Sequence, residues 1–174
     1  MSRSDIIIKF EDKLKQLETF LPTLKQSDIN CAELTFTNIL QILGIDNHLF
    51  HNAIIPLASG FGGYKSKKGW MGACGAVTGG CASIGIIQGG LKSRMNNLTM
   101  FTSYLKARKF CSDFETNFGS IVCSEICSFD FSTPEGIKKY IENDVWRNKC
   151  YKFILWAINK VQKLTRKELK EKWI

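Results

Sequence analysis

Proline is scarce in this chain, with three among 174 residues, so long helices are allowed almost everywhere. Alternation of apolar and polar residues with period two, the pattern of a half-buried strand, is also missing. Hydrophobic residues at 44% and charged residues at 23% exclude wholesale disorder and a collagen-like repeat. We therefore predict one all-α domain over residues 1–174, with an N-terminal helix in 1–22, a cysteine-containing core in 30–159 and a basic helix end in 160–174.

Several chemical motifs are missing as well. No two of the seven cysteines form Cys-x-x-Cys, which argues against a zinc ribbon, a thioredoxin-like active site and the common ferredoxin ligand runs. The lack of Cys-x-x-Cys-His excludes covalent c-type haem. No Ser/His/Asp or Cys/His arrangement has supporting spacing. The glycine-rich loop from Gly60 lacks the Lys-Ser ending of a P-loop.

The N-terminal segment does not have the pattern of a signal peptide, because Asp5, Lys9 and Glu11 interrupt its short apolar run. We therefore expect a reducing cytoplasm, where seven thiols indicate metal or redox chemistry rather than a disulfide framework. Residues 70–91 carry no charge and are long enough to span a bilayer. Their high glycine content favours a buried central helix over a membrane span.

Basic residues are concentrated near the C-terminus. Residues 138–174 hold 11 of the 24 basic and 4 of the 16 acidic residues, so +7 of the net charge of +8 lies there. Such a segment can attract an acidic partner protein, an anionic membrane or nucleic acid. A solvated lysine-rich helix face is the plainer interpretation, and without an RNA-binding signature or helix-turn-helix spacing we expect no nucleic-acid partner.

Apolar periodicity and capping residues predict the helices. Pro22 is expected to end the first helix, Gly44 the second, and Thr133-Pro134 to begin a later one. A final helix from near Asp144 carries a single apolar stripe. The expected helices before it cover residues 6–21, 31–43, 48–59, 74–88 and 96–117, with a helix or turn in 120–127.

The predicted helix 74–88 contains four glycines, which together disfavour it by roughly 3–4 kcal/mol relative to alanine. Small residues at i, i+4 leave two nearly bare stripes, on which another backbone or a cofactor can approach closely. Cys74 opens this helix, where unpaired backbone N–H groups and the helix dipole favour the thiolate. The alternative is that Cys74 is a small core residue. The stripes are Gly72/Ala76/Gly80 and Gly75/Gly79/Ser83.

The other cysteines are spread along the chain. Cys123 and Cys127 are four residues apart, and Cys74 and Cys81 seven apart, so each pair lies on one helix face. If four thiolates converge from four helices, they form a site that suits zinc or an iron–sulfur cluster. Zinc would act as a structural staple, whereas a cluster would carry electrons. Spacing alone does not separate the two.

Several segments together resemble the C_GCAxxG_C_C family, whose members are regarded as redox-active proteins named for four recurring cysteines. The matching segments are Gly60-Phe-Gly-Gly, Cys74-Gly-Ala-Val-Thr-Gly79, Phe114-Glu-Thr-Asn-Phe-Gly-Ser-Ile-Val-Cys123-Ser-Glu and a cysteine on the last helix. Residue by residue, the resemblance implies that the four cysteines are Cys31, Cys74, Cys123 and Cys150. The family is similar in turn to the iron–sulfur portion of the split-Soret cytochromes. That similarity implies a helical fold, a [2Fe–2S] or [4Fe–4S] cluster on cysteine thiolates and a redox partner protein. It is also compatible with a homodimer.

Three functional hypotheses follow. The first is an iron–sulfur electron carrier with Cys31, Cys74, Cys123 and Cys150 as metal ligands, and with Gly75 and Gly79 beside the cofactor. The second is a thiol–disulfide oxidoreductase or redox sensor with Cys74 as the catalytic nucleophile and Cys81 or Cys123 as the resolving thiol. The third is a zinc-stapled or metal-free helical interaction module that docks an acidic partner.

Overall fold

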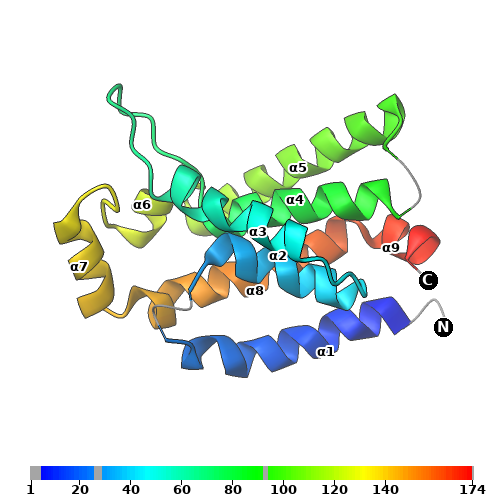
Figure 1. Cartoon of the computed structure of the whole chain (residues 1–174), viewed down its shortest axis with the longest axis horizontal. Helices are drawn as coiled ribbons and strands as arrows, with labels where there is room; N and C mark the ends of the chain where they lie inside the picture. Colours follow the sequence, from blue (N-terminus) through cyan, green and yellow to red (C-terminus); the bar gives the residue numbers. More distant parts are fainter. Residues whose placement is uncertain (1–4, 26–28, 92–93, 174) are drawn as a thin grey trace.

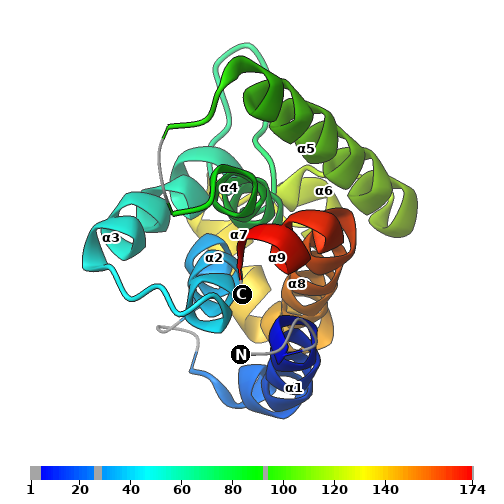
Figure 2. The same ribbon diagram turned by 90° about the vertical axis from the view of Figure 1, so that its right-hand side faces the viewer.

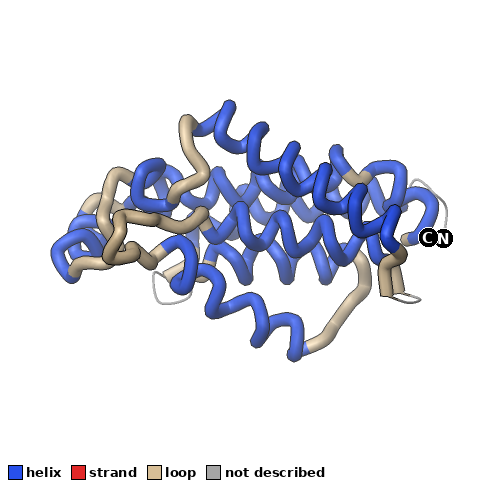
Figure 3. The backbone as a smooth tube through the Cα atoms, turned by 90° about the horizontal axis from the view of Figure 1, so that it is seen from above, coloured by secondary structure: helices blue, strands red, loops and turns tan. Residues whose placement is uncertain are grey.

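The computed structural model describes residues 5–25, 29–91 and 94–173, and within these residues the regular elements are helices, with no strand (Figures 1 and 3). This confirms the predicted all-α fold. The α-helices are α1 (Asp5–Phe20), α2 (Cys31–Ile42), α3 (His48–Leu57), α4 (Gly75–Gly89), α5 (Asn97–Phe118), α6 (Cys123–Cys127), α7 (Pro134–Glu142), α8 (Tyr151–Leu164) and α9 (Arg166–Lys172). A 3₁₀ turn, Leu21–Thr23, follows α1. One π-helical turn, Ala58–Gly62, follows α3, and another, Trp146–Cys150, precedes α8.

Helix α4 lies at the centre of the bundle (Figure 2). It packs against α2, α5 and α8, while α1 packs on the outside against α8 and α2. The short helices α6 and α7 lie at one end of the molecule, and the start of α1 and helix α9 lie at the other (Figure 1). Most of the long connections gather at the α6–α7 end.

Asparagine and threonine side chains set several helix starts, as capping chemistry predicts. The side chain of Asn30 accepts a 3.0 Å hydrogen bond from the Glu33 N–H at the start of α2, and Asn47 and Asn96 cap α3 and α5 in the same way. Thr133 caps α7, which has Pro134 at its first position. The sequence also offers Ser27 and Asp28 as capping residues before α2, and both lie outside the described residues.

The last predicted helix is in fact two helices, which corrects the sequence interpretation. Helix α8 ends at Leu164 and α9 begins at Arg166. Between them Thr165 is fully buried, and its hydroxyl donates a 2.7 Å hydrogen bond to the Val161 carbonyl. Such back-bonding by threonine competes with the regular helix pattern and favours a bend. The bend allows buried Trp173 to donate to the Ile87 carbonyl near the end of α4.

The apolar stripes predicted for the first and last helices form much of the core. Their buried members are Ile6, Phe10, Leu17, Leu21, Trp146, Cys150, Phe153, Ile154, Ala157, Ile158 and Val161. The Trp146 indole N–H donates a 3.0 Å hydrogen bond to the Leu21 carbonyl, which ties the two segments together. The uncharged segment contributes α4 to this core. In the part of the chain that the structure describes, no helix is both long enough and apolar enough to cross a bilayer.

The two bare stripes of α4 are covered by different neighbours. A Cβ on Gly79 would lie 2.5 Å from the Ala32 carbonyl oxygen, so this stripe meets the backbone of α2 directly. A Cβ on Gly80 would lie 2.4 Å from the Phe110 ring of α5. Gly85 has open space apart from an ordinary 4.0 Å contact with Met95. Close packing with α2 and α5 therefore offsets the low helix propensity of these glycines.

Gly79→Ala and Gly85→Ala form a matched test of this packing. Gly79→Ala should lower the free energy of unfolding by about 1–3 kcal/mol, because the backbones of α2 and α4 must separate. Gly85→Ala should raise it by about 0.8–1 kcal/mol, because alanine is the better helix former and has room. Urea denaturation followed by circular dichroism measures both, and equal effects of the two substitutions would contradict the packing argument.

Candidate redox site

Five of the seven cysteines meet at the end of the bundle where α6 and α7 lie, and we call them the five-thiol group. They come from four elements that are far apart in the sequence. Cys31 is the first residue of α2, Cys74 is the N-cap of α4, Cys123 and Cys127 are the two ends of α6, and Cys150 ends the π-helical turn before α8. The group contains all four cysteines singled out from the sequence and adds Cys127.

Backbone pairing fixes Cys74 next to the α6 segment. The Cys74 N–H donates a 2.8 Å hydrogen bond to the Ile121 carbonyl, and Ala73 and Val122 form an isolated antiparallel bridge. The Cys123 N–H donates in turn to the Gly72 carbonyl at 3.3 Å. Backbone pairing between residues 72–74 and 121–123 therefore holds Cys74 and Cys123 next to each other.

Glycines allow the other elements to close around the thiols. A Cβ on Gly75 would lie 2.9 Å from the Cβ of Cys31, and one on Gly62 would lie 3.3 Å from the Cβ of Cys123. A larger side chain at Gly75 would push Cys31 of α2 away from α4, and one at Gly62 would push the π-helical turn after α3 away from Cys123. Gly75 therefore lies at the site, whereas Gly79 lies one turn further along α4, against Ala32.

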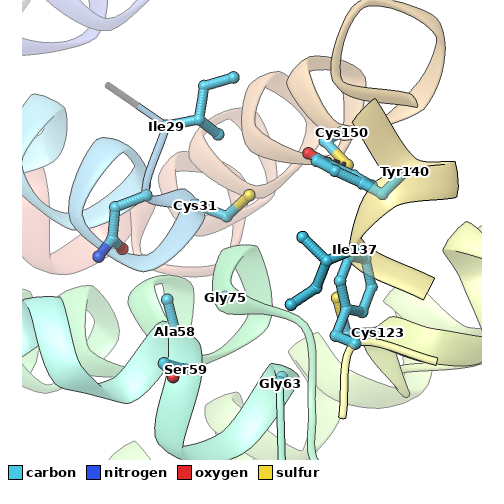
Figure 4. A pocket seen from close by; sticks show the side chains of 13 residues that line it. Ile29, Cys31, Ala58, Ser59, Gly63, Gly75, Cys123, Ile137, Tyr140 and Cys150 are labelled. Carbon is cyan, nitrogen blue, oxygen red and sulfur yellow. Dashed lines mark hydrogen bonds between the residues drawn. The ribbon is translucent and has the colours of Figure 1, made fainter. Parts of the chain in front are cut away.

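The sulfur atoms form a connected set. The Sγ atoms of Cys127 and Cys150 are 3.7 Å apart, Cys31 interacts with Cys150, and Cys123 interacts with both Cys127 and Cys74. The Tyr140 hydroxyl of α7 donates to the Cys150 Sγ over 3.6 Å (Figure 4). The set is sulfur-rich and has one phenol at its edge.

Contacts between the thiols, together with burial, shift the pKa values of these cysteines in opposite directions. Hydrogen bonds from Cys127 and Cys31 lower the pKa of Cys150 to about 4, with smaller help from Tyr140 and Lys149. The same bond to Cys150, together with burial, raises the pKa of Cys31 well above the ordinary thiol range. Hydrogen bonds with Cys127 and Cys74, and burial, also raise the pKa of Cys123.

Cys127 takes part in two opposing interactions. Its hydrogen bond with Cys123 acts to lower its pKa, but the bond to Cys150 and burial raise the pKa more. These interactions favour the thiolate at Cys150 and the protonated thiol at Cys31, Cys123 and Cys127.

A cavity of about 360 Å³ opens beside the five-thiol group. Cys31, Cys123 and Cys150 line it together with Gly75 and Tyr140 (Figure 4). Cys74 is 2% exposed and Cys150 4% exposed, whereas Cys31 and Cys123 are half-buried. The group therefore reaches the surface through the cysteines of α2 and α6.

The thiols touch one another rather than surround a single point. Within residues 5–25, 29–91 and 94–173, no three His, Cys, Asp or Glu side chains are arranged so that they could hold a metal ion without moving. Any metal group bound here would have to separate thiols that are now in contact, by rotation of their side chains.

The sequence interpretation missed one residue of this site and misplaced another. Cys127, which its spacing places on one helix face with Cys123, joins the group beside it. Tyr140 had no recognisable sequence signal. Cys81, expected to support Cys74, lies instead beside Cys111, with their Sγ atoms 3.8 Å apart.

The family comparison matches residues 29–164 to the model described as "Putative redox-active protein (C_GCAxxG_C_C)". The chain belongs to this family. The match covers every residue of the five-thiol group and starts beside Cys31. Comparisons with curated proteins and with solved structures found no match to this chain. The similarity to the split-Soret cytochromes therefore stays a prediction.

The letters GCAxxG in the family name also occur literally at Gly80-Cys81-Ala82-Ser83-Ile84-Gly85. That reading would make Cys81 the second of the four named cysteines. The structure groups Cys74, not Cys81, with Cys31, Cys123 and Cys150, so the geometry favours Cys74-Gly-Ala-Val-Thr-Gly79 as the segment that serves the site.

The lowered pKa of Cys150 predicts a thiolate in the metal-free protein that is present at neutral pH and lost as the pH falls through about 4. Ultraviolet thiolate absorbance measures this step. Cys150→Ser should remove it. Tyr140→Phe should move it to higher pH, because the thiolate loses a hydrogen-bond donor.

Tyr64→Phe is the matched control for this titration, because Tyr64 is 52% exposed and should leave the step in place. Loss of all thiolate absorbance within the ordinary thiol range would show that the five-thiol group does not stabilise a charge.

Proposed function

We propose that this redox-active family member is an electron-transfer protein in which Cys31, Cys74, Cys123 and Cys150 hold an iron–sulfur cluster, either [2Fe–2S] or [4Fe–4S]. The observation that carries the proposal is the meeting of these cysteines, from four separate elements, in one sulfur-only group beside a cavity. Cysteine thiolates are the usual protein ligands of iron–sulfur clusters.

The chemistry of the donor set fits such a group. Hydrogen bonds between the thiols, together with burial, oppose ionisation of Cys31, Cys123 and Cys127, so added positive charge would favour four thiolates here. Bound iron would supply that charge, and the remaining thiol protons would leave on binding. When bound, an iron–sulfur cluster accepts and releases electrons.

The chain's own residues would orient and shield the ligands. Gly75 lets the Cys31 thiol of α2 approach α4, and Gly62 lets the π-helical turn after α3 close against Cys123. Burial of Cys74 and Cys150 excludes water from one side. Cys31 and Cys123 border the cavity, on the side from which a redox partner protein would exchange electrons. Exposed Ile137 of α7 lines the same opening and offers it an apolar contact.

Thiol–disulfide exchange is the second candidate, and the 3.7 Å contact between Cys127 and Cys150 favours it. Here the Cys150 thiolate would attack a partner's disulfide, and Cys127 would resolve the mixed disulfide. Cys74, the nucleophile expected from the sequence, has Cys123 as its neighbour in this arrangement and not Cys81.

Anaerobic reconstitution of the full chain with ferrous iron and sulfide tests the first candidate. The product should be brown and contain iron and acid-labile sulfide, and reduction should bleach it reversibly. Serine substitutions at Cys31, Cys74, Cys123 or Cys150 should each lower iron content sharply, because each removes one ligand.

Two kinds of variant complete this experiment. Cys81→Ser and Cys111→Ser are matched controls and should keep full iron content, because they lie outside the five-thiol group. Cys127→Ser should keep the cluster, and loss of iron there with retention in Cys74→Ser would overturn the ligand set. Protein that stays colourless and iron-free after reconstitution would overturn the electron-transfer proposal, and zinc bound in place of iron would point to a structural staple.

A further inference from the structure

A second pair of thiols lies away from the five-thiol group, at the contact between α4 and α5. The Sγ atoms of Cys81 and Cys111 are 3.8 Å apart, and both residues are half-buried rather than sealed in the core. The role proposed above for the site makes no use of either residue. Their partial exposure leaves them open to small reagents.

Packing on both sides holds the two cysteines face to face. The residues that precede them, Gly80 and Phe110, are in close contact, and the Phe110 ring fills the space that a side chain on Gly80 would take. Phe110 is fully buried and also packs against Trp156 of α8, with ring centroids 5.6 Å apart. This contact fixes the register of the two helices, so Cys81 and Cys111 remain opposite each other.

The contact between the two thiols shifts their pKa values in opposite directions. The hydrogen bond from Cys81 lowers the pKa of Cys111 to about 7, against the opposing effects of burial and of Glu115. The same hydrogen bond, together with burial, raises the pKa of Cys81 far above the ordinary thiol range. The arrangement provides a nucleophilic thiolate beside a protonated thiol, as thiol–disulfide exchange requires.

We propose that Cys81 and Cys111 are a second redox site, which a low-molecular-weight disulfide such as glutathione disulfide oxidises to a disulfide bond between α4 and α5. The Cys111 thiolate attacks one sulfur of the reagent, forms a mixed disulfide and releases one thiolate. Cys81 then loses its proton and attacks the Cys111 Sγ, which releases the second thiolate. Two electrons pass from the protein to the reagent, and two protein thiols become one disulfide.

The wild-type full chain, reduced, desalted and exposed to glutathione disulfide, provides the test. Trypsin and glutamyl endopeptidase together isolate Cys111 in residues 110–115, away from Cys123 and Cys127. Mass spectrometry should find this peptide joined to residues 69–92, which contain Cys81 and Cys74. Trypsin alone would leave Cys111, Cys123 and Cys127 on one peptide and could not assign the bond.

Serine variants assign the roles. Cys81→Ser should stop the reaction at the mixed disulfide, with glutathione retained on residues 110–115. Cys111→Ser should leave Cys81 with roughly tenfold less glutathione than Cys111 acquires in Cys81→Ser, because Cys81 stays protonated. Serine is close in size to cysteine, and circular dichroism checks that both variants fold.

Three results would overturn the proposal: no cross-linked peptide in the wild type, a link that persists in Cys81→Ser and so belongs to Cys74, or disulfide-linked dimers on a non-reducing gel. The outcome is independent of the iron–sulfur proposal. The Cys81→Ser, Cys111→Ser double variant should still take up iron on reconstitution, and an iron-free wild type could still form this disulfide.

Discussion

The contact between α2 and α4 without intervening side chains is the constraint on which the site depends. Gly75 and Gly79 let the backbone of α2 at Ala32 approach α4 to a distance that a Cβ would not allow. Cys31 precedes Ala32 and Cys74 precedes Gly75, so the same contact places both thiols at one end of the helix pair. The low helix propensity of glycine is therefore a cost of bringing α2 and α4 together.

Helix α4 organises two thiol sets because its two stripes face different neighbours. The Gly79 stripe meets α2 and leads back to Cys74, whereas the Gly80 stripe meets Phe110 of α5, next to the Cys81–Cys111 pair. The two sets differ in chemistry. Contacts within the five-thiol group favour the thiolate at Cys150 and oppose ionisation of Cys31, an imbalance that a bound metal would relieve. The Cys81 and Cys111 thiols, whose sulfur atoms are in contact, are suited instead to forming a disulfide.

Local sequence signals were sufficient for the helices but only partly for the site. Capping residues and apolar periodicity located almost every helix, because these effects act within a few residues of the chain. The break at Thr165 was missed because it depends on a buried hydroxyl bonding within its own helix. Tyr140 and the partner of Cys81 were missed for another reason. Which cysteines come together depends on which helix packs against each face of α4. Sequence periodicity identifies the faces of a helix but not the helices that pack against them.

The charge distribution along the molecule bears on metal binding. We predicted that the basic C-terminal segment docks a partner or is solvated. Two of its lysines are instead engaged in packing. Lys160 forms a 2.7 Å ion pair with Asp113, and Lys172 donates a hydrogen bond to the Gln88 carbonyl near the end of α4. An ammonium there suits the negative end of the helix dipole. Helix α9 and its lysines therefore lie at the end of α4 opposite the thiols (Figure 1). Lys149 is the cation that acts on Cys150, and it contributes less than the thiol hydrogen bonds. Thiol–thiol hydrogen bonds and burial oppose further ionisation here, so the positive charge of a bound metal would favour several thiolates, whereas a purely dithiol mechanism does not require them.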